Sequence, residues 1–367
     1  MSAARGRMAG DDLRFMKMAL RLARRGLGYT EPNPMVGAVV ARDGRVLAAG
    51  FHARFGAAHA ETMALERLAA PGATLYLTLE PCSHFGKTPP CADLIIRKKV
   101  RRVVMAMLDP NPLVNGAGLA RLRAAGIQAE VGLCGAEAGR LNRHYLTFMR
   151  TGRPWVTLHA GVSLDGKMTD REGRSRWVTP SELRRCSHSL RGEFSAVMAG
   201  SGTVLADDPL LTLREPGWEG KTLLRVVLDA GAALPRERRV FRARERFPLV
   251  VFSGLAAAGN GRKGERHVFV PADGEGLNLD AVLKALAGMG IASLLVEGGG
   301  RLIDSFLRRG LWDEAVFFYS GRIVGGRDAV QPFASGTCLD AAPELAGRHW
   351  TPLAGGAILR GYRCSPG

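Results

Sequence analysis

The spacing of apolar residues in the first part of the chain predicts alternating helices and strands. Apolar residues recur at helical intervals between Asp12 and Gly26, which predicts an amphipathic first helix. Short apolar runs predict strands at 36–40, 45–50, 74–79, 103–107 and 127–131, and longer periodic segments predict helices at 59–69, 91–99 and 118–125. Asp43-Gly44 predicts a hairpin turn between the first two strands. This pattern indicates a layered domain with a mixed sheet that ends near Met149.

Strand and helix patterns alternate again after the linker-like sequence from Thr151 to Pro154. Strands are predicted at 155–160, 196–199, 224–229, 249–252, 293–297 and 314–319, and helices from Ser181 onward, at 279–289 and at 301–309. Such alternation is typical of an α/β sheet with parallel strands. A chain of 367 residues also exceeds what one hydrophobic core usually serves. We therefore expect two domains, residues 1–149 and residues 154–367.

Composition limits the location of the protein. Charged residues interrupt every apolar run before it is long enough to cross a bilayer. The first ten residues lack the apolar stretch of a signal peptide, and we expect them to form a frayed tail. Six cysteines are too sparse for a disulfide scaffold of this length. We expect a cytoplasmic protein with no membrane partner.

The formal net charge of +17 leaves two interpretations open. A basic surface attracts anions, whether nucleic acid, lipid headgroups or phosphorylated metabolites. The basic residues are scattered along the chain and form no long basic arm, so a general compositional preference for arginine explains the charge equally well. Charge alone does not choose between these interpretations.

The strongest chemical signal combines His59, Glu61, Cys82 and Cys91. Zinc prefers nitrogen and thiolate ligands in a tetrahedron, and a catalytic zinc site keeps one position for water. One histidine and two cysteines leave that position open, and we expect both cysteines at or near helix N-termini, which favour thiolates. Zinc makes a water reactive near neutral pH, and Glu61 could transfer its protons. A core histidine beside two unrelated buried cysteines is the alternative, which the combination of all four residues disfavours. The same signature is typical of zinc nucleobase deaminases.

Glycine-rich segments in the second half suggest a phosphate site. Gly298-Gly299-Gly300 follows an apolar strand and precedes a helix, and Gly200-Ser201-Gly202-Thr203 follows another strand. Glycines at such positions let backbone N–H groups approach a phosphate. Tight turns without a ligand have the same composition. The sequence Asp207-Asp208-Pro209 that follows could form an acidic cluster or be merely a helix cap.

Several segments resemble one family. The two cysteines are separated by eight residues, 83–90, and this long spacing, with the sequences 32–37, 79–82 and 109–112, resembles the deaminases of riboflavin biosynthesis. Sequences at 163–167, 175–177 and 200–214 resemble the reductase half of the same bifunctional enzymes. The resemblance extends from about Pro32 to Gly326.

The resemblance implies a cytidine-deaminase-like three-layer domain followed by an α/β domain like dihydrofolate reductase. It implies zinc-dependent hydrolytic deamination of 2,5-diamino-6-ribosylamino-4(3H)-pyrimidinone 5′-phosphate, then NADPH-dependent reduction of the ribosyl side chain to ribityl. It also implies a small phosphorylated pyrimidine as the partner, no nucleic acid, and self-association through the second domain. A nucleoside or tRNA deaminase with an appended reductase-like domain, and a non-catalytic protein with structural zinc, are the alternatives.

The resemblance also implies roles for individual residues. In the first half, the base and its phosphate would contact Asn33, Lys87, Asp109 and Asn111, although asparagine and aspartate are also common turn formers. NADPH would contact Gly161, Trp177, Thr203, Asp207, Gly298, Gly299, Gly300 and Arg301. The reductase substrate would contact His159, Ser175, Arg191, Leu211, Arg214 and Glu297. Arginine suits its phosphate because a guanidinium group binds two oxygens at once, but Arg191 would equally suit a solvated helix face.

The chain departs from the family pattern at one position. His159 stands where the family usually has a lysine in the first strand of the reductase domain. Histidine is only partly protonated at neutral pH. We hypothesise that His159 replaces the lysine as a hydrogen-bond donor, at some cost in rate or with a lower pH optimum.

Overall fold

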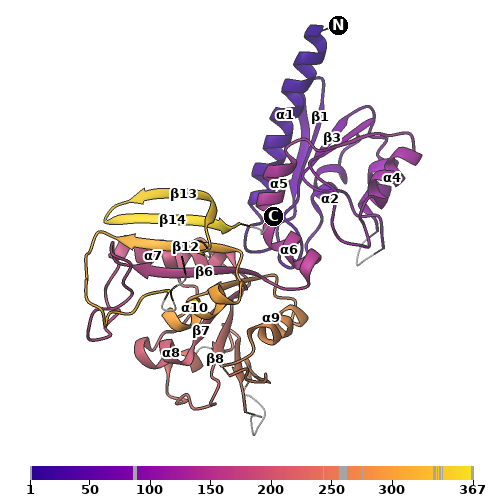
Figure 1. Ribbon diagram of the computed structural model, residues 1–367. Coiled ribbons are helices and arrows are strands. Elements are labelled where there is room, and N and C mark those ends of the chain that lie inside the picture. The colour runs from indigo at the N-terminus through magenta and orange to yellow at the C-terminus, as the bar shows by residue number, and fades with distance from the viewer. Residues whose placement is uncertain are drawn as a thin grey trace. The chain divides into compact units, whose positions relative to one another are not determined.

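The computed structural model describes residues 2–85, 89–242, 244–255, 263–274, 276–333, 336, 338, 340 and 342–364. The chain divides into two compact units, Met1–Gly152 and Arg153–Gly367 (Figure 1). Within the described residues, none of the helices is long and apolar enough to span a bilayer.

The first unit contains the predicted elements and two further helices. In chain order they are α1 (Ser2–Arg24), β1 (Gly37–Arg42), β2 (Arg45–Phe51), α2 (Ala60–Leu65), β3 (Thr74–Leu77), α3 (Cys91–Arg97), β4 (Arg102–Met105), α4 (Ala117–Ala124), β5 (Gln128–Val131), α5 (Gly135–Leu141) and α6 (Arg143–Thr151). The expectation of a frayed tail is wrong, because α1 begins at Ser2. Helices α5 and α6 were not anticipated.

A mixed sheet with helices on both faces forms the first unit. Among the described residues its strand order is β2-β1-β3-β4-β5, with β1 antiparallel to β2 and β3, and β3, β4 and β5 parallel. Helices α2, α3 and α4 pack on one face, and α1 and α5 pack on the other. This arrangement confirms the predicted three-layer fold. Because β3 and β4 end at the edge where β1 begins, the loops before β1, after β3 and after β4 meet there, as ligand-binding loops of α/β sheets commonly do.

The second unit is larger and also alternates strands with helices. Its elements are β6 (Trp155–Val162), α7 (Ser181–Leu190), the 3₁₀ helix η1 (Arg191–Glu193), β7 (Ala196–Gly200), α8 (Ser201–Asp207), β8 (Leu224–Leu228), the 3₁₀ helix η2 (Arg239–Phe241), β9 (Leu249–Ser253), β10 (Glu265–Phe269), α9 (Leu279–Gly288), β11 (Ser293–Val296), α10 (Gly300–Arg308), β12 (Glu314–Ser320), β13 (Leu345–Leu353) and β14 (Gly356–Arg363).

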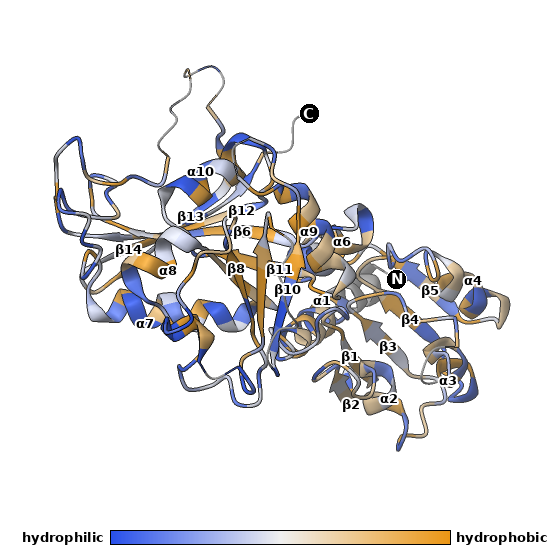
Figure 2. Cartoon of the chain, turned by 90° about the horizontal axis from the view of Figure 1, so that it is seen from below, coloured by the Kyte–Doolittle hydropathy of each residue, from blue (hydrophilic) through white to orange (hydrophobic). Residues whose placement is uncertain are grey.

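The sheet of the second unit has the order β10-β9-β8-β7-β11-β6-β12-β14-β13 among the described residues. The strands from β10 to β12 run parallel, and the hairpin of β13 and β14 adds an antiparallel edge. Strands β8 and β11 are strongly hydrophobic (Figure 2), as strands covered on both faces must be. Helices α9 and α10 cover one face, and α7 and α8 contribute to clusters on the other. The mixed α/β class is confirmed, while α8, β10, β13 and β14 were not predicted.

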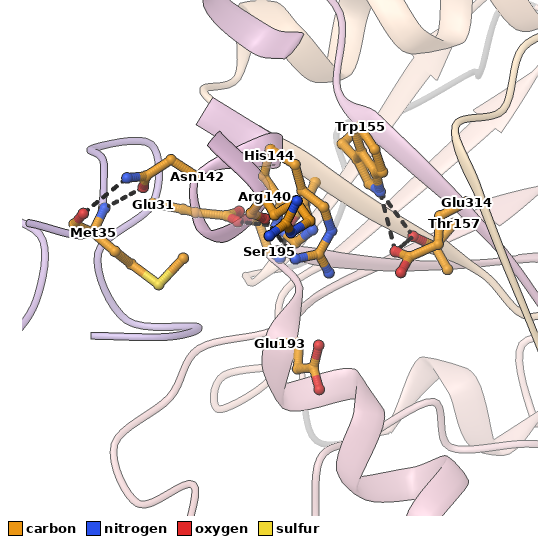
Figure 3. Close-up of polar contacts among 12 residues, drawn as sticks. Glu31, Met35, Arg140, Asn142, His144, Trp155, Thr157, Glu193, Ser195 and Glu314 are labelled. Carbon is orange, nitrogen blue, oxygen red and sulfur yellow. Dashed lines mark hydrogen bonds and ion pairs between the residues drawn. The ribbon is translucent and has the colours of Figure 1, made fainter. Parts of the chain in front are cut away.

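A buried acidic group connects three strands of this sheet. The fully buried Glu314 carboxylate accepts hydrogen bonds from Thr157 Oγ1 (2.9 Å) and Trp155 Nε1 (3.3 Å) (Figure 3). It also lies 3.2 Å from Arg360 Nε. A buried charge is tolerated only when it is paired and hydrogen-bonded, so these contacts hold β6, β12 and β14 in one register.

Candidate functional site

Three potential metal ligands converge in the first unit. His59 Nδ1 lies 3.3 Å from Cys91 Sγ and 3.7 Å from Cys82 Sγ, and all three ligand atoms lie within 4.8 Å of one another. Zinc bound at about 2.0 Å to nitrogen and about 2.3 Å to sulfur places two tetrahedral ligands roughly 3.5 Å apart. The ligand types and their separations therefore fit zinc.

Local structure explains why these atoms meet. His59 is the N-cap of α2, and Cys91 is the first residue of α3. Cys82 lies in the loop after β3, where its Sγ accepts the Cys91 N–H (3.3 Å) and its carbonyl accepts the Ala92 N–H (3.2 Å). Cys82 therefore begins no helix of its own, contrary to the simplest form of the expectation, but lies against the start of α3. The N–H groups there favour a thiolate.

The electrostatics of the site suit metal binding and proton transfer. The hydrogen bond from the Cys91 thiol, opposed by burial and assisted by His59, lowers the pKa of Cys82 to about 4. The hydrogen bond to Cys82 raises the pKa of His59. Burial raises the pKa of Glu61 to about 7, so this carboxyl group can both accept and donate a proton near neutral pH.

His52 connects Asn33 to the metal-ligand region and was not singled out from the sequence. Its Nε2 lies 3.3 Å from Asn33 Nδ2, and its Nδ1 lies 3.1 Å from the carbonyl oxygen of Ala58. Its ring packs edge-on against the His59 ring, with centroids 5.7 Å apart. Burial lowers the pKa of His52, which favours a neutral ring. The structure thus places Asn33 beside the ligand cluster.

The loop after β4 carries the other predicted base-binding residues. Asp109 is buried, and its Oδ1 accepts the Asn111 N–H at 2.9 Å. Burial raises the pKa of Asp109. The Glu80 carboxylate, for which the sequence predicted no role of its own, accepts the N–H groups of Asp109 (3.2 Å), Gly116 (2.9 Å) and Leu119 (3.0 Å). Lys87 lies outside the described residues.

A cavity of about 990 Å³ in the second unit gathers most of the predicted NADPH-binding residues. Its lining includes Thr203, Asp207 and the segment Gly298–Arg301, together with Ser175 from the predicted substrate set. The Gly299 N–H donates to Thr203 Oγ1 (2.8 Å), and Ser175 Oγ donates to Asp207 Oδ1 (2.5 Å). The glycine segments therefore border a cavity.

Two predicted cofactor-binding residues do not line this cavity. Trp177 is 56% exposed, with the Arg184 guanidinium 4.0 Å from its ring centroid. Gly161 faces Thr179, whose Cγ2 lies 2.9 Å from where a Cβ would stand. Their contact with NADPH stays a prediction.

Arg191 and Glu297 form a buried ion pair that the sequence could not show. Two guanidinium nitrogens of Arg191 donate to the two carboxylate oxygens at 2.7 and 2.6 Å, and Nη1 donates to the Thr212 carbonyl (2.8 Å). Burial opposes ionisation of Glu297, but the charge of Arg191 keeps the pKa of Glu297 below its usual value. Arg191 is therefore not on a solvated helix face.

The other two predicted substrate contacts differ in their exposure. The Leu211 side chain packs into a hydrophobic cluster, so only its backbone could contact a substrate. Arg214 is exposed.

His159 lies beside this ion pair as a neutral ring. Burial lowers its pKa to about 4, with the attraction of Glu297 opposed by the charges of Arg191 and His188. Its Nε2 lies 2.9 Å from Ser187 Oγ. The partial protonation expected at neutral pH is therefore wrong for the folded protein. His159 can still donate one hydrogen bond, and Arg191 supplies the fixed positive charge beside Glu297.

The fold and these sites define a zinc-dependent deaminase unit joined to a reductase unit. Residues 9–107 match the family described as the cytidine and deoxycytidylate deaminase zinc-binding region, and residues 154–359 match the RibD C-terminal domain. The chain is 44% identical to the riboflavin biosynthesis protein RibD of Aquifex aeolicus over 316 residues, which cover 86% of this chain and 88% of that protein. It is 38% identical to the RibD of Escherichia coli over 330 residues, covering 86% and 89%.

Solved structures agree over nearly the whole chain. A deaminase/reductase from Thermotoga maritima, described as acting on diaminohydroxyphosphoribosylaminopyrimidine and 5-amino-6-(5-phosphoribosylamino)uracil, has a TM-score of 0.86 at 35% identity and covers 97% of this chain and 99% of its own. A RibD structure from Acinetobacter baumannii has a TM-score of 0.87 at 33% identity, with the same coverage. The chain belongs to the RibD family of bifunctional riboflavin biosynthesis enzymes, with a zinc-dependent deaminase domain and an NADPH-dependent reductase domain. The resemblance, the fold class and both cofactors are thereby confirmed.

Proposed function

We propose that the first unit deaminates 2,5-diamino-6-ribosylamino-4(3H)-pyrimidinone 5′-phosphate by hydrolysis, and that the second unit reduces the ribosyl side chain of the product to ribityl. The observation that carries this proposal is the cluster of His59, Cys82 and Cys91 beside the buried carboxyl group of Glu61. A purely structural zinc site would not require an ionisable carboxyl group next to its ligands. The alternative, a nucleoside or tRNA deaminase with an appended reductase-like domain, assigns no substrate to the second half of the chain, where residues 154–359 match the RibD C-terminal domain.

In the first unit, each group has a role that its surroundings support. Zinc held by His59, Cys82 and Cys91 would make a water nucleophilic near neutral pH. Glu61 takes a proton during attack on the ring carbon and delivers one to the leaving amine, because its pKa of about 7 suits both transfers. Asn33 lies beside the cluster and binds the base.

The remaining contacts to the deaminase substrate come from two further loops. Asp109 and Asn111, in the loop after β4, bind the polar edge of the base or the sugar. Lys87 binds the phosphate.

In the second unit, NADPH would supply the hydride that reduces the opened sugar. Backbone N–H groups at the start of α10 and the side chain of Thr203 bind its phosphates, since this part of the cavity is lined by glycine. Arg191 and Glu297 orient the sugar, and Arg214 is exposed to receive its phosphate. His159 donates a hydrogen bond from a neutral ring.

The test uses the full-length protein with the diaminopyrimidinone phosphate as its single pyrimidine substrate. Ammonia release reports deamination, loss of NADPH absorbance reports reduction, and mass spectrometry distinguishes replacement of an amino group by oxygen from gain of two hydrogens. We expect ammonia without NADPH and both products with it. NADPH oxidation without prior ammonia release would contradict the proposed order of the two reactions. The absence of both ammonia release and NADPH oxidation would contradict the proposed substrate.

We further propose that the protein works in the cytoplasm as a homo-oligomer. Metal-binding thiolates require reducing conditions. Strand β13 ends the sheet of the second unit, and most of its residues are exposed, including Trp350 at 54%. An exposed edge strand is suited to pair with a second copy across a two-fold axis. Light scattering should give at least a dimeric mass, and Trp350→Lys should lower it.

A further inference from the structure

Helix α6 and the residue before it contact the substrate loops of the deaminase, although they lie outside the matched zinc-binding region of residues 9–107. The side chains concerned are Asn142, His144 and Tyr145, which are 1%, 5% and 5% exposed. None of them is a metal ligand or a predicted substrate contact. Their partners all lie in segments that carry the predicted base-binding residues.

Asn142 fixes the loop that contains Asn33. Its Oδ1 accepts the Met35 N–H (2.8 Å) and its Nδ2 donates to the Met35 carbonyl (2.9 Å), as the two dashed lines in Figure 3 show. A side-chain amide satisfies a backbone donor and acceptor together, which neither aspartate nor alanine can do. Two bonds to one residue fix both the position and the orientation of that part of the loop.

His144 holds the same loop at its other end. Its Nδ1 lies 2.7 Å from Glu31 Oε1 (Figure 3). Glu31 and Met35 stand on either side of Asn33, so contacts from this short segment bracket the residue expected to bind the base. A loop with both flanks attached loses less conformational entropy when the ligand binds.

Tyr145 fixes the second substrate loop. Its hydroxyl donates to Asp109 Oδ1 (2.7 Å), the same oxygen that accepts the Asn111 N–H. Because the bond fixes the rotamer of Asp109, it also fixes which oxygen of that carboxyl group remains available to a substrate. Without the Tyr145 hydroxyl this oxygen would keep the Asn111 N–H but lose its second hydrogen bond, and the loss of a buried hydrogen bond is destabilising.

Apolar packing places this segment at the loop edge of the sheet. Tyr145 and Leu146 form a buried cluster with Leu79, and Val36 and Met107 pack against it. Val36 follows the Asn33 loop, Leu79 precedes the Cys82 loop, and Met107 precedes the Asp109 loop. The helix therefore packs where all three loops meet the sheet.

We infer that Asn142, His144 and Tyr145 are positioning residues of the deaminase, which hold the Asn33 and Asp109 loops in the geometry that binds the pyrimidine. This inference rests on the proposed function of the first unit. The alternative is that the segment only stabilises the fold, and the two differ in what a mild substitution changes.

Tyr145→Phe is the discriminating variant, and Tyr76→Phe is its matched control. Tyr76 is also a buried tyrosine of the first unit, and its hydroxyl donates to Asp12 Oδ1 (2.6 Å), but it packs against α1 on the sheet face. Each substitution removes one hydroxyl bonded to one carboxylate. We expect Tyr145→Phe to raise the KM of deamination by about fivefold to tenfold, the effect of one buried hydrogen bond, with kcat within about twofold. Tyr76→Phe should leave both constants unchanged.

Hydrogen–deuterium exchange of the full chain supplies a readout that does not depend on activity. Tyr145→Phe should speed exchange in the peptide containing Asn111, and Asn142→Asp should speed it in the peptide containing Met35, while Tyr76→Phe changes neither. Zinc content should stay that of the parent protein. Equal effects of Tyr145→Phe and Tyr76→Phe, or a fall in kcat without a change in KM, would overturn the inference. If the parent protein fails to deaminate the pyrimidine, the proposed function fails while the exchange data still decide the positioning role.

Discussion

Glu61 is buried and lies two residues after His59, and burial raises its pKa to about 7, close to neutral pH. We predict that Glu61→Gln lowers kcat for deamination by about 10²-fold to 10⁴-fold, the range typical of a lost general acid–base group. Zinc content should be unchanged, because Glu61 is not one of the three ligands. Ammonia release in steady state checks this prediction. Full deaminase activity in the variant would remove Glu61 from the mechanism.

His159 makes the stability of the second unit depend on pH. Its pKa is about 4 in the folded protein because of burial, against about 6.5 in an unfolded chain. As the pH falls, the unfolded chain takes up the proton first, so the stabilisation is complete above about pH 6.5 and is lost between there and about pH 4. The difference corresponds to about 3 kcal/mol.

Denaturant unfolding checks this prediction and can be followed in the second unit alone, because all five tryptophans lie there. Between pH 4.5 and pH 6.5, the unfolded chain binds about one more proton at His159 than the folded protein does. His159→Gln should therefore lower the slope of the unfolding free energy against pH by the amount that one proton contributes. An unchanged slope would show that His159 is charged in the folded protein.

The chemical role of a residue could be inferred from the sequence where that residue belongs to a motif with a characteristic set of residue types and spacings. His59, Glu61, Cys82 and Cys91 form such a pattern, because zinc restricts both ligand type and spacing. Glu80 could not be assigned a role, because its three N–H partners lie between 29 and 39 residues away along the chain. The protonation state of His159 also depends on burial, which no local pattern records.

At the scale of elements, Glu80 acts as a tether for the start of α4 and for the loop after β4. We predict that Glu80→Gln destabilises the first unit by about 1–3 kcal/mol, since an amide cannot accept three N–H bonds as a carboxylate does, and that it raises KM for deamination. Thermal unfolding and steady-state kinetics check both effects. Glu130→Gln is the control, because Glu130 is 58% exposed and bonds to Arg102 at the surface, where such a pair contributes less than about 1 kcal/mol.

The elements that the sequence predicted are those with one consistent pattern of burial. Strands β8 and β11 are almost entirely apolar, and each was identified. Strand β13 was missed because it lies at an edge with most side chains in solvent, so its sequence has no hydrophobic alternation. Helix α8 was interpreted as part of a glycine loop, because it has only seven residues and the glycines at its start have low helix propensity.

At the scale of the whole molecule, the two activities depend on different units. The three proposed zinc ligands lie in the first unit, and the glycine-lined cavity lies in the second. We predict that a zinc chelator abolishes ammonia release but leaves NADPH oxidation intact when the deaminated aminouracil phosphate is supplied directly. Absorbance at the NADPH band checks this. Loss of both activities would show that the reductase requires the metal-loaded first unit.

The division into two domains was predictable from length and from the linker-like sequence, but the order of strands was not. In the second unit β6 lies between β11 and β12, although more than a hundred residues separate β6 from either in the chain. Such neighbours are selected by packing among distant segments, which local periodicity does not record.

The position of α6 in the chain also determines when the deaminase can become functional. His59, Cys82 and Cys91 are synthesised before α6, and Asn142 and His144 contact the segment around Asn33 across 107 and 113 residues of sequence. Domains generally fold as units, with the N-terminal domain first, so the first unit has both flanks of its Asn33 loop attached only after translation has passed α6.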